Sequence, residues 1–118
     1  MRLLCVYKPS KPEGTALSPE AIAAMGEFVE KSFKSGWLLA TEGCLPSAAG
    51  ARVRRAGEKV TVTDGPFTEA KELIGGFALI QADSKAQAIE YTKQFLHVAG
   101  DGETEIRQIC DAPPNATR

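Results

Sequence analysis

A carboxylate closes an apolar stripe in the run VTVTDGPF at residues 60–67. Val60 and Val62 alternate with threonines, a pattern typical of a half-buried strand. The same period of two places Asp64 on the face of the two valines, where we expect it to be partly buried at the strand end. A carboxylate in that position could act as a general acid or base.

A structural role for Asp64 is also open, because the residues that follow it form turns. Gly65 and Pro66 end the strand, and an aspartate that begins a turn commonly accepts hydrogen bonds from the backbone N–H groups within it. Pro66 has no N–H of its own, so the amides to be satisfied belong to its neighbours Gly65, Phe67 and Thr68. The residue types favour this turn role over catalysis, and one aspartate can serve both.

Further polar and aromatic residues could surround this carboxylate in a binding cleft. Glu69 and Lys71 could hold a charged ligand, whereas on a solvated helical turn they would form only local ion pairs. Tyr7 and Phe67 could line an apolar pocket, to which the tyrosine hydroxyl adds a polar group; for Phe67, core packing is the alternative. Glu42 ends an expected strand near the same rim. These residues define the expected small-molecule site.

Metal ligation is not expected. The chain has one histidine, His97, and its three cysteines, Cys5, Cys44 and Cys110, match no zinc or C-x-x-C spacing. No pair of acids has a calcium or two-metal layout. The sequence therefore predicts neither a metal nor a cofactor, and Cys5, inside an apolar strand pattern, is expected to be a buried, unreactive thiol.

Composition predicts one soluble domain of ordinary type. The 118 residues are 43% hydrophobic and 25% charged, with a formal net charge of -1, which gives no electrostatic reason to expect nucleic acid or a membrane as a partner. No apolar run approaches the about 20 residues that span a bilayer, and the N-terminal apolar stretch is too short for a signal peptide. We expect a cytoplasmic protein with one domain over residues 1–111 and a loose polar tail at 112–118.

Periodicity and turn residues predict a regular order of elements. Two helices are expected, between 18 and 36 and between 84 and 97, with a hairpin within 51–64 and strands at 2–7, 37–43, 75–82 and 103–110. Two helices that cross between strands indicate an α+β fold, the split β-α-β subunit of ferredoxin-like proteins, here with an inserted hairpin. This arrangement places both helices on one face of the sheet.

The sheet face away from the helices needs a cover. The strands at 2–7 and 75–82 are apolar on both faces, so the face without helices would expose apolar side chains to water. In a chain of this length, a second copy is the most economical cover. The sequence therefore predicts a homodimer that forms through this sheet face.

The run VTDGPFTEAKELIGGF resembles the signature of the DGPF branch of the YCII-related family. Further short matches fall in the family's order and approximate spacing from Met1 to about Cys110: YK after the first strand, SPE before the helix, GCLPSA and ARVR. The resemblance implies a ferredoxin-like subunit that pairs into a dimeric α/β barrel. This implication agrees with the two-faced strands.

The resemblance narrows the function to two hypotheses and leaves open whether the chain is an enzyme. Dimeric α/β barrel proteins include isomerases, monooxygenases and dehalogenases of small molecules. In the shorter YCII branch a His–Asp pair is a proposed active site; Asp64 matches that aspartate, but the segment around Leu17 and Ser18 offers no histidine. The first hypothesis is a protein that binds or converts a small organic molecule, without a metal, in a cleft between sheet and helices near Asp64. The second is a regulatory or interaction protein, because DGPF members are often encoded beside extracytoplasmic-function sigma factors.

Overall fold

The structure, a computed structural model, describes residues 1–67, 69 and 73–111 of the chain. Its elements follow the predicted order, with one short 3₁₀ helix (η1) added: β1 (Arg2–Pro9), α1 (Pro19–Lys34), β2 (Leu38–Gly43), η1 (Ser47–Ala49), β3 (Ala51–Ala56), β4 (Lys59–Asp64), β5 (Gly76–Gln81), α2 (Lys85–Ala99) and β6 (Gly102–Gln108). The expected tail at 112–118 lies outside the described residues, so the domain bounds stay a prediction.

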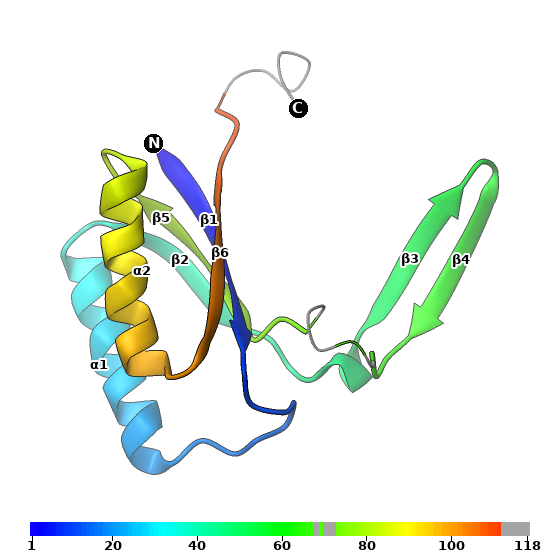
Figure 1. Cartoon of the computed structure of the whole chain (residues 1–118), viewed down its shortest axis with the longest axis horizontal. Coiled ribbons are helices and arrows are strands. Elements are labelled where there is room, and N and C mark those ends of the chain that lie inside the picture. The colour runs from blue at the N-terminus through cyan, green and yellow to red at the C-terminus, as the bar shows by residue number, and fades with distance from the viewer. Residues whose placement is uncertain (68, 70–72, 112–118) are drawn as a thin grey trace.

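Four strands form one antiparallel sheet in the order β2-β5-β1-β6. Both helices lie on the same face of this sheet (Figure 1). This arrangement is the ferredoxin-like fold, and the predicted α+β class is confirmed. The strands β3 and β4 form a separate two-stranded sheet, which is the predicted inserted hairpin.

Both helices begin at serine caps, as their sequences predict. The Ser18 hydroxyl oxygen accepts a backbone N–H of the first turn at 3.1 Å, and Pro19 occupies the first helical position, where its missing N–H costs nothing. At α2, Ser84 accepts the N–H of Gln87 at 3.1 Å, and the Gln87 side chain accepts the N–H of Asp83 at 2.6 Å. These bonds fix where each helix starts.

The core lies between the helices and the sheet. Its buried members come from β1, α2, and the strands and turn around them: Leu3, Cys5, Leu38, Ile80, Ala82 and Ala88. Cys5 is among them, as its place in an apolar strand predicts. Larger aromatic residues of the helices and of the segment before β2 pack around this centre without being fully buried. They enclose the space described in the next section.

The opposite face of the sheet, called the outer face below, carries the alternate residues of the same strands. Val6 pairs with Phe77 on β5 and with Glu105 on β6, and Leu4 pairs with Leu79. Neither described helix covers this face (Figure 1), and Phe77 is 39% exposed. The prediction that the central strands are apolar on both faces is confirmed.

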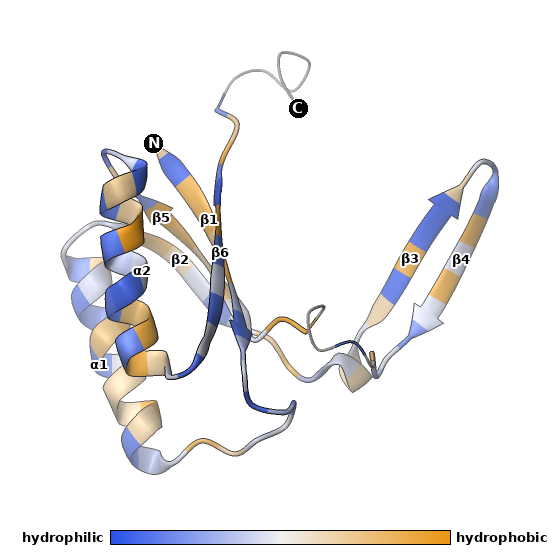
Figure 2. Cartoon of the chain, in the orientation of Figure 1, coloured by the Kyte–Doolittle hydropathy of each residue, from blue (hydrophilic) through white to orange (hydrophobic). Residues whose placement is uncertain are grey.

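The β3–β4 hairpin, called the arm below, projects from the body on the side opposite the helices (Figure 1). Val53 pairs with Val62 across the arm, and these side chains are 71% and 64% exposed, while Val60 is 58% exposed. Figure 2 shows hydrophobic bands alternating with hydrophilic ones along both strands. The radius of gyration is 16.2 Å, against about 13.5 Å for a compact domain of this length. The predicted half-buried strand is therefore wrong for the single chain, because the described residues provide nothing that covers its apolar side.

Candidate functional site

A cavity of about 600 Å³ lies between the helices and the sheet. Its lining includes six aromatic residues: Tyr7 from β1, Phe28 from α1, Trp37 just before β2, Phe77 from β5, and Tyr91 and Phe95 from α2. Tyr91 and Phe95 are four residues apart, so they lie on the same face of α2. A mostly apolar cavity of this size is typical of small-molecule sites. We call it the aromatic cavity.

The aromatic rings hold one another in fixed orientations. The rings of Trp37 and Tyr91 are stacked, with centroids 4.3 Å apart and 6° between their planes. Tyr7 and Phe95 meet edge to face, with centroids 5.1 Å apart. The Phe28 ring lies 6.0 Å from that of Trp37 and 6.4 Å from that of Phe95. These are favourable ring geometries, so a flat ligand would meet preformed aromatic walls.

Threonines of β2, α2 and β6 place hydroxyl groups in the lining, and two of these are used by the protein itself. Thr41 donates to the carbonyl oxygen of Phe77 at 2.9 Å, and Thr92 donates to that of Ala88 at 2.8 Å. Thr104 differs, because its buried Oγ1 has no hydrogen-bond partner among the described residues. A buried polar group without a partner costs about 1–3 kcal/mol. A ligand oxygen at this point would remove that cost.

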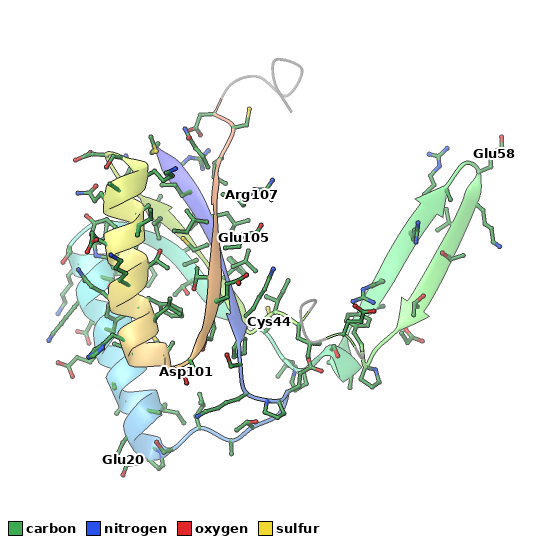
Figure 3. All side chains as sticks on the ribbon, viewed as in Figure 1. Glu20, Cys44, Glu58, Asp101, Glu105 and Arg107 are labelled. Atoms are coloured by element: carbon green, nitrogen blue, oxygen red, sulfur yellow. The ribbon has the colours of Figure 1, made fainter. Side chains whose placement is uncertain are left out.

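Tyr7 and Cys5 contribute uncharged groups to the aromatic cavity at neutral pH. Burial raises the pKa of the Cys5 thiol, and a hydrogen bond with Thr92 opposes this only in part. Burial also raises the pKa of the Tyr7 hydroxyl, and the nearby Asp101 carboxylate raises it further. The Tyr7 hydroxyl donates to the backbone carbonyl of Asp101 at 3.2 Å, where β6 begins (Figure 3). A thiol kept protonated in this way is a poor nucleophile. Beside these neutral groups, the lining includes the charged residues Lys11, Glu13, Glu42 and Asp101.

The structure divides the predicted site residues into two groups. Tyr7 lines the aromatic cavity, and so does Glu42, although its pairing with Phe77 directs the Glu42 side chain toward the outer face. Phe67 lines a second, more open cavity at the root of the arm. Asp64 and Glu69 line neither of these two cavities, and Lys71 lies outside the described residues.

The expected burial of Asp64 is wrong, because this residue is exposed. It ends β4, and β4 belongs to the projecting arm rather than to the four-stranded sheet. The period of two correctly predicts the strand face on which Asp64 lies. It does not predict that the whole face is open to solvent.

The DGPF turn is held by neighbouring segments rather than by the Asp64 side chain. The N–H of Gly65 donates to the carbonyl oxygen of Gly50 at 3.0 Å, and the N–H of Phe67 donates to Oγ of Ser47 at 2.8 Å. The turn role predicts that the Asp64 carboxylate accepts hydrogen bonds from both of these N–H groups. The predicted turn role of Asp64 is therefore wrong for these two donors, and the third candidate, Thr68, lies outside the described residues.

Ser47 is an organising residue that the sequence analysis missed. Its N–H and its hydroxyl donate to the two oxygens of the Glu13 carboxylate, at 2.6 and 2.7 Å. The Arg52 guanidinium lies 3.8 Å from the centroid of the Phe67 ring, a cation–π contact. A Cβ added to Gly65 would overlap the Ser47 carbonyl group, so this close approach requires glycine. The signal in the sequence is the run GCLPSA, which contains Ser47.

Across the described ranges, no group of three or more histidine, cysteine, aspartate or glutamate side chains is arranged to hold a metal ion. In that part of the chain, no helix is long and apolar enough to cross a membrane.

Comparisons connect the chain to a family, a sequence relative and a solved structure. The model of the YCII-related domain matches residues 1–113. An uncharacterised protein of Rhizobium meliloti is 29% identical over 102 residues, which are 86% of this chain and 79% of that protein. The structure of 5-chloro-2-hydroxyhydroquinone dehydrochlorinase from Burkholderia phenoliruptrix, in complex with 2,5-dihydroxybenzoquinone, matches with a TM-score of 0.54 at 15% identity, covering 93% of this chain and 95% of that one. This likeness shows that the two chains share a fold, which in this chain is ferredoxin-like.

Proposed function

Because the chain belongs to the YCII-related family, we propose that it binds a small organic molecule in the aromatic cavity and uses no metal to do so. The observation that carries this proposal is the buried Thr104 hydroxyl, which lines the cavity and has no partner among the described residues. Buried polar groups in proteins are nearly always satisfied. We infer that a ligand bound in the aromatic cavity supplies this buried hydroxyl with its hydrogen-bond partner.

The proposed ligand is a flat ring that carries an oxygen substituent. The stacked and edge-on rings around the cavity favour a planar molecule. Thr104 favours an oxygen at one end of it, and the neutral Tyr7 hydroxyl sets no requirement for charge. The dehydrochlorinase of the same fold is in complex with a dihydroxybenzoquinone, which is a molecule of this chemical kind.

We further propose that the bound ligand can be converted chemically in the cavity. Of the predicted site residues that the structure describes, Tyr7 is the one that brings a titratable side chain into the aromatic cavity. Its hydroxyl is protonated at neutral pH and donates to the Asp101 carbonyl, so its oxygen can accept a hydrogen bond from a ligand hydroxyl. Asp64 has no assigned part in this chemistry within one chain, because it does not line the cavity.

The fluorescence of Trp37 gives a direct test, because it is the single tryptophan of the chain and lines the cavity. We expect 2,5-dihydroxybenzoquinone or a related hydroquinone to quench it saturably and to raise the melting temperature. Thr104→Val keeps the shape of the side chain and removes the hydroxyl. It should weaken binding by about fivefold to tenfold, the worth of one net hydrogen bond.

Thr61→Val is the matched control, because it removes a threonine hydroxyl from the exposed arm, and it should bind like the parent. Equal affinity of the parent and Thr104→Val would remove the assigned contact. An absence of saturable quenching across a panel of phenols and quinones would remove the ligand class.

A regulatory or interaction role is supported by a separate observation, the exposed valines of the arm. Apolar side chains grouped on one exposed surface mark contact sites. A link to an extracytoplasmic-function sigma factor belongs to this second proposal and draws on the resemblance to DGPF proteins alone. Co-purification of such a factor with the parent, and its loss with Val62→Asp, would support this role.

A further inference from the structure

The arm has two chemically different sides. Val53 pairs with Val62, and Val60 pairs with Arg55, so the three valines lie on one side of the hairpin. The other side carries polar and basic residues with one alanine: Arg52, Arg54, Ala56, Lys59, Thr61 and Thr63. We call the first the valine side. The arm is thus amphipathic, and an apolar side of this kind normally packs against another part of a protein.

The described residues of the single chain offer the arm no such support. The two strands contact each other far more than they contact any other described element. Every residue of β3 and β4 is exposed. A lone two-stranded hairpin is at best marginally stable in water, and hairpins gain stability by packing an apolar face on another element. The valine side therefore calls for a partner surface.

A second uncovered apolar surface lies on the same side of the molecule. The outer face of the sheet, with Leu4, Val6, Phe77 and Leu79 at its centre, points away from the helices and toward the side from which the arm projects (Figure 1). A molecule bound to the outer face would therefore also lie close enough to contact the arm. One occupant can cover both surfaces.

Charge indicates what this occupant is. The arm, residues 51–64, holds four basic and two acidic residues, a net charge of +2, with Glu58 at its tip (Figure 3). Because the whole chain carries -1, the remainder carries -3. Arg52, Arg54 and Lys59 lie on the side opposite the valines, so this charge acts at long range. It attracts an arm to the body of another copy and repels another arm. Two copies related by a twofold axis satisfy both demands at once.

We propose that the arm clasps a second copy of this chain. The second copy sits on the outer face of the sheet, the valine side of the arm packs against its body, and its own arm does the same in return. The DGPF turn, at the root of the arm, then lies at the junction of the two copies. This assignment goes beyond a pairing of two sheet faces, because it gives the inserted hairpin a share of the interface.

Val62→Asp tests the clasp, with Thr61→Asp as a matched control on the opposite side of the same strand. In sedimentation equilibrium across the micromolar range, we expect the parent to be a dimer. Val62→Asp should raise the dimer dissociation constant by about tenfold or more, as expected for a buried apolar contact, and Thr61→Asp should change it by less than about twofold. A monomeric parent, or equal dissociation constants for the two variants, would overturn the proposal.

A chain without the arm separates the clasp from direct pairing of two arms. A short Gly-Ser turn can replace residues 52–63, because Ala51 and Asp64 are already paired neighbours. If each arm grips the body of the other copy, a heterodimer of parent and armless chains should have a dissociation constant between those of the two homodimers. If arms pair only with each other, the heterodimer should be as weak as the armless homodimer, and that result would refute the clasp.

Discussion

Ser47 joins three segments of the chain through one side chain and one backbone amide. Its hydroxyl accepts the N–H of Phe67 and donates to Glu13, and its own N–H also donates to Glu13. The Ser47 carbonyl lies against Gly65. At the scale of single residues, the DGPF turn thus depends on a serine that is distant in the sequence.

Ser47→Ala should therefore lower the free energy of unfolding by about 1–2 kcal/mol, because it leaves the Phe67 N–H without its acceptor. Asp64→Ala should lower it by less than about 0.5 kcal/mol, since Asp64 is exposed and its two candidate turn amides bond elsewhere. Denaturant unfolding followed by circular dichroism measures both. Asp64→Asn is the control for charge and should match the parent. A larger loss for Asp64→Ala than for Ser47→Ala would restore the turn role to Asp64.

At the scale of elements, the junction between β4 and the segment after it has no room for a side chain. A Cβ on Gly65 would overlap the backbone of η1, which cannot give way as a flexible side chain can. Gly26, in the middle of α1, is the opposite case: a Cβ there meets nothing within 4 Å. The two glycines therefore have different reasons to be glycine.

Alanine at these two positions should change stability in opposite directions. Gly65→Ala should cost about 2–3 kcal/mol, because backbone must move to admit the methyl group. Gly26→Ala should add about 0.5–1 kcal/mol, because alanine loses less conformational freedom in a helix. Thermal unfolding of the two variants beside the parent is the measurement. A stabilising Gly65→Ala would show that the turn does not pack on η1 in solution.

Local signals in the sequence predict the elements well and the contacts between them poorly. Ser18 and Ser84 announce the two helices, because capping depends on residues three positions away. Tyr91 and Phe95 stand at helical spacing and could have indicated one wall of the cavity. The ring that stacks on Tyr91 belongs to Trp37, far away in the chain, and only tertiary packing brings it there. The acceptors of the DGPF turn escaped prediction for the same reason.

For the arm too, the sequence predicts the element but not its contacts with other parts of the structure. Alternation in residues 51–64 predicts its pairing, which the register confirms at Val53 and Val62. Alternation reports that one side is apolar but not what covers it. Thr104 is similar, because no local pattern says that its hydroxyl will be buried without a partner.

At the scale of the whole molecule, charge is divided between a basic arm and an acidic body. If the arm clasps a second copy, part of the attraction is electrostatic and is screened by salt, since the Debye length is about 10 Å at 0.1 M. We expect the dimer dissociation constant of the parent to rise severalfold as sodium chloride is raised. The armless chain should show a weaker dependence in the same sedimentation experiment. Tighter dimers of the parent at high salt would point to an apolar contact without the charge term.

Glu13 belongs to two sites at once. It is in the lining of the aromatic cavity and of the cavity at the root of the arm, and its carboxylate holds Ser47. A ligand that displaces Glu13 would therefore loosen the anchor of the arm, and engagement of the arm would change the affinity for that ligand. Thermodynamic linkage makes the two effects equal in free energy. Cavity occupancy and subunit association would then be two readouts of one coupled equilibrium, with Glu13 as its mechanical connection.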